Sequence, residues 1–192
     1  MAQSISLAQT LHDLPSVYAP SSTLRAKIRQ RLSSSASTPI LVVLDDDPTG
    51  TQTCHNINVL TTWSTSVLAN ELSSTSSGSG FFILTNSRAL HPDAARELVT
   101  EICQNLKEAG KQTGKDFEIV LRSDSTLRGH FPLEAETVED VQGESDAWIL
   151  APFFLQGGRY TIDDVHYVAE GDKLVPVGYG DERTTHSAHA YR

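Results

Sequence analysis

Four short apolar runs stand out along the chain, and each one leads to a cluster of polar or charged residues, at once in three cases and after Pro152–Leu155 in the fourth. They are Ile40–Leu44, Phe81–Thr85, Phe117–Leu121 and Ala147–Ala151. Short apolar runs without a polar alternation are typical of strands that are buried on both faces of a parallel sheet. Stretches with helical periodicity separate these runs. The pattern therefore predicts an α/β fold with three layers, in which a mostly parallel sheet carries helices on both faces.

The strongest helical pattern covers Pro92–Ala109, where apolar residues recur with a period near 3.6. Pro92 suits the first turn of this helix, and Gly110 is the predicted stop. Weaker patterns predict helices at Ser22–Leu32, Ser64–Leu72 and Glu134–Val141, and further strands at Ile57–Thr61 and Leu174–Val177.

Three regions differ in character along the sequence. Residues 1–39 are polar and uneven, so we expect an N-terminal arm that packs loosely and is partly flexible. Residues 40–178 hold the regular pattern and form the predicted domain. Residues 179–192 lack this pattern and form an atypical tail.

The polar residues that follow the four apolar runs are the most informative feature. They are the clusters Asp45–Gly50, Thr85–Arg88, Arg122–Gly129 and Gln156–Arg159. The carboxyl ends of parallel strands meet at one edge of a sheet, and ligands bind there in open α/β folds. We therefore expect these clusters to surround one crevice. The alternative is that they are ordinary surface loops, which are polar in any protein.

Asp45, Asp46 and Asp47 carry the negative charge of the predicted crevice. Adjacent carboxylates raise one another's pKa unless cations or hydrogen-bond donors stabilise them. They can accept hydrogen bonds from sugar hydroxyls, and one of them could act as a general base. The alternative is a side chain that caps a turn, which explains one aspartate more easily than three.

The positive charge comes from Arg122, Arg128 and Arg159, with Arg88 as a further candidate. A guanidinium group can hold a carboxylate through two parallel hydrogen bonds. The alternative for any one of these arginines is a surface ion pair, which contributes little energy. Hydroxyl side chains at Ser123, Ser125 and Thr126 stand beside Arg128 and favour a ligand-binding role.

Composition narrows the class of protein. The 192 residues suit one domain, and the net charge of −9 argues against nucleic-acid or anionic-membrane partners. The chain shows neither a signal peptide nor an apolar stretch of about 18 residues, the length of a membrane span.

The two cysteines, Cys54 and Cys103, lack metal-binding spacing and fit a reducing compartment. We therefore predict a cytoplasmic protein without a structural metal. No glycine-rich phosphate loop is present.

One resemblance depends on Asp45 and Asp47. The spacing Asp45-x-Asp47-x-Thr49 after an apolar strand resembles the first motif of the haloacid-dehalogenase-like phosphatases. That resemblance implies a magnesium-dependent phosphatase with Asp45 as nucleophile and Asp47 as general acid. Asp163-Asp164 would be the late acidic pair of that family. Lys115 does not clearly match the lysine motif, and the residues from Ser123 to Gly129 stay unexplained.

A second resemblance covers more of the chain, from about residue 40 to about residue 177. It rests on Asp46–Gly50, Ser123–Gly129 and Gly158–Thr161. In this order, these segments resemble the N-terminal domain of the four-carbon acid sugar kinases, and Asp-Ser-Thr-Leu-Arg-Gly is the most specific part. The resemblance implies an ATP-dependent kinase for a sugar acid such as erythronate, threonate or a 3-oxo-tetronate.

In that family the N-terminal domain binds the sugar acid, and a C-terminal domain supplies most of the site for ATP and Mg²⁺. The sequence ends at Arg192, so we expect the C-terminal domain to be absent, through natural truncation or a gene-model error. The chain alone is then expected to be inactive. The missing domain or a second copy of the chain are the expected protein partners.

The resemblance assigns substrate binding to seven residues and leaves the catalytic residue unassigned. They are Asp46, Asp47, Thr49, Ser125, Thr126, Arg128 and Arg159. Three features depart from the family pattern: the additional acid Asp45, His130 in place of a common asparagine, and the tail at residues 179–192.

Overall fold

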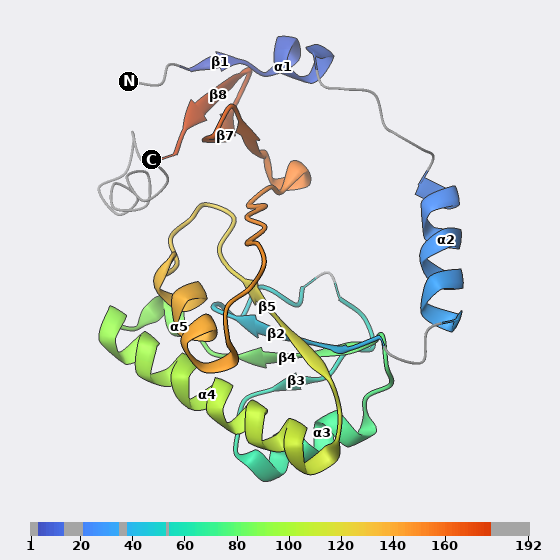
Figure 1. The fold of residues 1–192 in the computed structure, drawn as a ribbon. Coiled ribbons are helices and arrows are strands. Elements are labelled where there is room, and N and C mark those ends of the chain that lie inside the picture. Colours follow the sequence, from blue (N-terminus) through green and yellow to red (C-terminus); the bar gives the residue numbers. More distant parts are fainter. Residues whose placement is uncertain (1–3, 14–20, 35–37, 53, 178–192) are drawn as a thin grey trace.

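The computed structural model describes residues 4–13, 21–34, 38–52 and 54–177. At its centre lies a parallel sheet of four strands in the order β3-β4-β2-β5. The strands are β2 (Ile40–Asp45), β3 (Val59–Leu60), β4 (Gly80–Leu84) and β5 (Phe117–Arg122). The parallel sheet flanked by helices confirms the α/β fold class that the apolar runs predicted (Figure 1).

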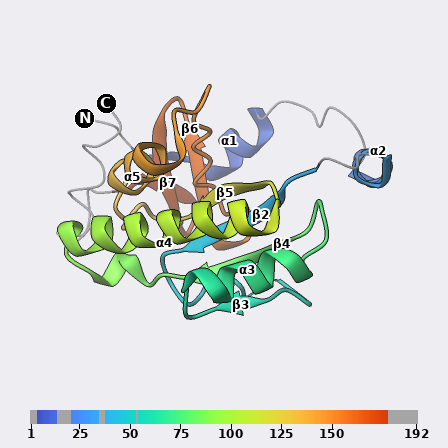
Figure 2. The ribbon, with the colours of Figure 1, turned by 60° about the horizontal axis from the view of Figure 1, so that its bottom comes forward.

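Helices pack on the face of β2 that carries Ile40, Val42 and Leu44, all of which are buried. These helices are α3 (Thr65–Ser74), α4 (Pro92–Thr113) and α5 (Leu133–Gln142), and α3 and α4 lie side by side (Figure 2). The helix α2 (Ser21–Ser34) stands apart from them. On the opposite face of the sheet, Leu41 and Val120 remain 40% and 44% exposed.

A second sheet, which the apolar pattern did not predict, is antiparallel and has the order β1-β8-β7-β6. Its strands are β1 (Ile5–Ser6), β6 (Arg159–Ile162), β7 (Val165–Glu170) and β8 (Lys173–Pro176). Strand β1 belongs to the predicted N-terminal arm and is followed by α1 (Leu7–Asp13).

The hairpin between β6 and β7 turns at Asp163 and Asp164, which both have positive φ angles, 47° and 62°. Two positive φ angles are typical of a tight two-residue hairpin turn, in which aspartate is tolerated. The pair that resembled a phosphatase motif therefore forms a turn.

The predicted strand at Ala147–Ala151 is wrong. These residues form no regular structure, and Ile149 is 93% exposed. An apolar run becomes a strand only where its backbone finds a neighbouring strand, and the parallel sheet ends at β5 among the described residues. Arg159 consequently does not follow a strand of the parallel sheet; it begins β6 instead.

The predicted stop of α4 at Gly110 is also wrong. The helix continues to Thr113 and ends at Gly114, which has the left-handed φ angle of 63° common after helices. Gly110 has a packing role: a Cβ atom there would lie 2.8 Å from Cε1 of Phe117. The sequence pattern could not distinguish a glycine that ends a helix from one that makes room for an aromatic ring.

The other predicted elements are confirmed with shifted ends, since β3 is shorter than Ile57–Thr61 and β8 begins at Lys173. The tail at residues 179–192 lies outside the described residues. Within the described ranges, we find no helix with the length and apolar character needed to cross a membrane.

Candidate functional site

Three buried carboxylates lie at the carboxyl end of β2, the strand flanked by β4 and β5. Asp45 is its last residue, and Asp46 and Asp47 begin the following turn. The backbone ties this turn to both neighbours. The amide of Asp46 donates to the carbonyl of Arg122 over 3.2 Å, and the amide of Arg88 donates to the carbonyl of Asp46 over 3.3 Å. The predicted convergence of strand ends is therefore correct for β2, β4 and β5.

Arginines from the two neighbouring strand ends neutralise these acids. Arg88, in the short 3-10 helix η1 (Ser87–Ala89) after β4, forms an ion pair with Asp47 and lies 3.1 Å from Asp124 Oδ1. Arg122 ends β5, and its Nη1 lies 3.3 Å from Asp45 Oδ1 and 3.5 Å from Asp46 Oδ1.

Asp124 organises the loop after β5. Nε and Nη2 of Arg128 donate to its two carboxylate oxygens over 2.7 and 2.9 Å. The amide and hydroxyl of Thr126 donate to Asp124 Oδ2, and the amide of Asp124 donates to Asp46 Oδ2 over 3.2 Å. Burial alone would raise the pKa of Asp124, but the hydrogen bonds from Arg128 and Thr126 hold it below its usual range.

We call these seven charged residues the acid–arginine cluster: Asp45, Asp46, Asp47, Arg88, Arg122, Asp124 and Arg128. Burial raises the pKa of Asp45 to about 6, although the charge of Arg122 opposes the shift. Burial also raises the pKa of Asp46, against a hydrogen bond from the Asp124 amide and the charges of Arg88 and Arg122.

The turn after Asp47 shows why Thr49 and Gly50 occupy their positions. The amide of Thr49 donates to Asp47 Oδ1 over 2.6 Å, so Asp47 caps the turn. The exposed Thr49 thus stands beside the cluster. A Cβ atom at Gly50 would lie 2.1 Å from both carboxylate oxygens of Asp45, so only glycine fits against this buried acid.

His166 of β7 links the antiparallel sheet to the loop after β5, which contains Asp124. Its Nε2 lies 2.5 Å from the carbonyl oxygen of Ser125, and its Nδ1 lies 3.0 Å from the hydroxyl of Thr161. Burial lowers the pKa of His166, and the charges of Arg159 and Asp124 also act on it. The charge of Arg159 therefore acts on His166, which contacts the loop after β5 that holds Asp124.

Helix α5 contributes Glu134, which is buried in its first turn. Burial raises the pKa of Glu134, a hydrogen bond with Ser87 lowers it, and the negative charge of Asp46 raises it. Glu134 therefore faces the acidic side of the cluster.

The structure thus brings Asp46, Asp47, Thr126 and Arg128 together, and it places Ser125 beside them through its carbonyl group. Asp124, Glu134 and His166 also belong to the site, although the sequence assigned no role to them. Asp124 lies inside the most specific motif. A glutamate in a first helical turn ordinarily interacts with the helix dipole, so nothing in the pattern indicated that Glu134 is buried.

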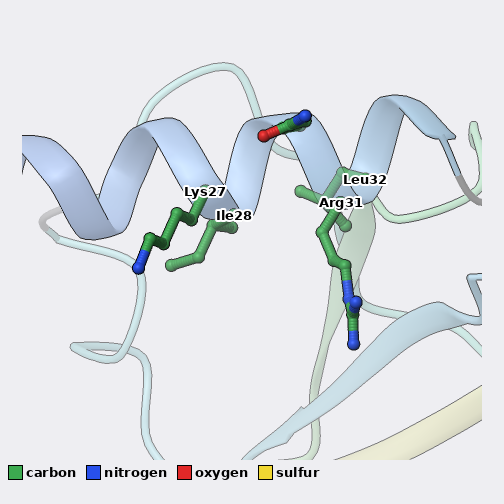
Figure 3. Close-up of a pocket in the computed structure, with 5 residues that line it drawn as sticks. Lys27, Ile28, Arg31 and Leu32 are labelled. Atoms are coloured by element: carbon green, nitrogen blue, oxygen red, sulfur yellow. The ribbon is translucent and has the colours of Figure 1, made fainter.

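A pocket elsewhere on the molecule is unrelated to this cluster. It is lined by residues of α2 alone: Lys27, Ile28, Gln30, Arg31 and Leu32 (Figure 3). None of them belongs to the acid–arginine cluster. Among the described residues, no group of three histidine, cysteine or acidic side chains is arranged to hold a metal ion.

The sequence was compared with known protein families and with curated proteins. The family described as "Sugar-binding N-terminal domain" matches residues 41–190, which include the whole parallel sheet after its first residue. No curated protein matches the chain. Because the match covers most of the sequence and contains every residue of the acid–arginine cluster, the chain belongs to the family of sugar-binding N-terminal domains.

Proposed function

We propose that this domain binds a four-carbon sugar acid, such as erythronate, threonate or a 3-oxo-tetronate, as the substrate-binding half of an ATP-dependent kinase. The observation that carries the proposal is the buried acid–arginine cluster at the end of β2, in a chain of a sugar-binding family. The motifs that resemble the four-carbon acid sugar kinases supply residues of this cluster, including Asp46, Asp47 and Arg128.

The chemistry of the cluster agrees with such a ligand. Carboxylates accept hydrogen bonds from sugar hydroxyls, and guanidinium groups donate to a carboxylate. Carboxylates and guanidinium groups contact one another at the ends of β2, β4 and β5. Their mutual ion pairs hold the side chains in place before a ligand arrives, which reduces the entropy lost on binding.

The kinase part of the proposal concerns a longer protein than this domain. Phosphoryl transfer depends on positioning and on charge stabilisation around the phosphates. We assign no step of the transfer to a metal or nucleotide here. The proposed role of this chain is to hold the acceptor, in the cytoplasm, where Cys54 and Cys103 stay as free thiols.

No observation favours the phosphatase alternative. Its nucleophile would be Asp45, which is 1% exposed and paired with Arg122. Its late acidic pair, Asp163 and Asp164, forms the turn between β6 and β7.

The test is a thermal-shift and calorimetric screen of the whole chain against erythronate and threonate, with butyrate as the control ligand. A ligand at one hundred times its Kd stabilises the native state by about 2.7 kcal/mol. For a chain of this size, that raises Tm by about 5 to 10 °C. We expect this rise for at least one tetronate and a clearly smaller rise for butyrate at the same concentration, because butyrate offers the carboxylate without the hydroxyl groups.

Arg128→Ala is expected to remove most of the ligand-induced rise. Arg96→Ala, which removes a distant arginine on α4, is the control and leaves the rise intact. If neither tetronate raises Tm, the proposed function is wrong. ATP-dependent phosphorylation of a tetronate by this chain alone would contradict its assignment as an acceptor-binding half.

A further inference from the structure

Three buried side-chain polar atoms lack a hydrogen-bond partner within the described part of the chain. They are Asp46 Oδ1, Glu134 Oε1 and Arg159 Nε. Leaving a buried polar atom unsatisfied is unfavourable, and native proteins contain few such atoms. All three belong to residues placed at or beside the acid–arginine cluster, so their clustering calls for an explanation specific to this site.

These residues are connected through the cluster. The negative charge of Asp46 contributes to raising the pKa of Glu134, after burial, which is the larger cause. Asp46 Oδ2 accepts from the amide of Asp124, and the charges of Asp124 and Arg159 both act on His166. The unsatisfied atoms therefore belong to residues that these interactions link to Asp124, two acceptors through Asp46 and a donor through His166.

The other arginines are already engaged by acids of the protein. Arg128 holds Asp124 through two hydrogen bonds, and Arg88 pairs with Asp47 and Asp124. Arg122 pairs with Asp45, and its Nη1 also lies 3.5 Å from Asp46 Oδ1, beyond the length of a good hydrogen bond. For Arg159, Nη1 donates to the carbonyl of Gly157 and Nε has no acceptor. A ligand carboxylate can therefore bind Nε of Arg159 without displacing an acceptor of the protein.

We infer that the site binds its ligand in one orientation, with the carboxylate on Nε of Arg159 and the hydroxyl groups on Asp46 Oδ1 and Glu134 Oε1. A polyhydroxy acid carries the donors and the acceptor that these three atoms lack. Glu134 thereby becomes a residue that selects for hydroxyl groups, a role that the sequence did not assign to it. This inference rests on the proposed function and adds the direction in which the sugar acid lies.

The alternative role for Glu134 is structural. A carboxyl group that only supports α5 through Ser87 would matter for folding and not for the choice of ligand. The two roles separate when ligands that differ in one functional group are compared. Erythronate has both hydroxyls and a carboxylate, erythritol has only hydroxyls, and butyrate has only the carboxylate.

The experiment measures the Kd of the whole chain for these three compounds, by calorimetry for erythronate and by competition against erythronate for the other two. Glu134→Gln keeps the shape of the side chain but replaces one acceptor oxygen with a donor. We expect it to weaken erythronate and erythritol about tenfold to a hundredfold, the effect of losing a hydrogen bond to a charged group. Binding of butyrate should stay unchanged.

Arg159→Gln should give the opposite pattern. It weakens erythronate and butyrate by a similar factor and leaves erythritol unchanged. Glu136→Gln is the matched control because Glu136 lies on the same helix, α5, and is exposed. It should alter none of the three affinities.

The orientation is wrong if Glu134→Gln leaves the affinities for erythronate and erythritol unchanged, or if Arg159→Gln weakens erythritol as strongly as erythronate. Equal weakening of all three ligands by both variants points to a loss of structure and also overturns the inference. If the unaltered chain binds no tetronate, the proposed function itself fails. These outcomes separate an error in orientation from an error in ligand class.

Discussion

At the scale of single residues, the burial of Asp45 makes the stability of the folded protein depend on pH. Burial raises the pKa of this carboxyl group from its usual value of 3.8 to about 6. The folded protein therefore keeps the proton of Asp45 over a pH range in which the unfolded chain has lost it. Because the folded state then binds more protons at this group, the contribution of Asp45 to stability falls as pH rises from about 4 to about 6 and levels off above that range.

Asp45→Asn removes this titration. The free energy of unfolding of the variant, relative to that of the unaltered protein, should rise between pH 4 and 6 by at most about 3 kcal/mol and then stay constant. Chemical denaturation at several pH values measures the difference. Asp93→Asn is the matched control because it replaces an exposed aspartate on α4 with the same residue. A difference between Asp45→Asn and the unaltered protein that does not vary with pH would refute the assignment.

At the scale of elements, His166 joins the antiparallel sheet to the loop that holds Asp124. A carbonyl oxygen can only accept, so Nε2 of His166 carries the proton and donates to the carbonyl of Ser125. Its lowered pKa favours the neutral ring, in which Nδ1 accepts from the hydroxyl of Thr161. One side chain thus links β6, β7 and the loop after β5.

His166→Leu should lower the free energy of unfolding by about 1 to 3 kcal/mol, since it leaves the carbonyl of Ser125 without its donor. It should also speed amide hydrogen exchange in residues 123–129. His166→Gln can still donate through its amide and should recover part of both effects. Since His91 is exposed, His91→Leu is the control. Unchanged exchange in the loop of His166→Leu would show that the two elements are not coupled there.

At the scale of the whole molecule, apolar side chains are unevenly distributed. The core between the parallel sheet and its helices is closely packed, and Ile102 of α4 is fully buried. The segment after α5 instead exposes six large apolar residues: Trp148, Ile149, Leu150, Phe153, Phe154 and Leu155. Exposed apolar patches of this kind are common where another protein surface binds, or where chains aggregate.

Substitutions at the two kinds of position should therefore differ sharply. Ile149→Ser should change the free energy of unfolding by less than about 0.5 kcal/mol and reduce the binding of a hydrophobic dye to the native protein. Ile102→Ala should lower the free energy of unfolding by about 2 to 5 kcal/mol. Urea denaturation of both variants gives the comparison. A large loss of stability in Ile149→Ser would mean that this side chain is buried in solution.

The sequence by itself determined the parallel part of the fold. The strands β2, β4 and β5 follow from short apolar runs, and the helix α4 follows from its period near 3.6, because each buries apolar side chains in a shared core. It also determined that charged residues meet at the ends of these strands, since parallel strands end at one edge.

Tertiary structure alone decided which groups pair and which stay unsatisfied. Ala147–Ala151 has the composition of a strand but no neighbour to pair with, and Arg159 begins a strand of the antiparallel sheet. Likewise, Arg128 is held by Asp124, whereas Glu134 is buried beside Asp46. Local pattern records whether a residue tends to be buried. It does not record which distant residue will be its partner, because that depends on how the chain packs in three dimensions.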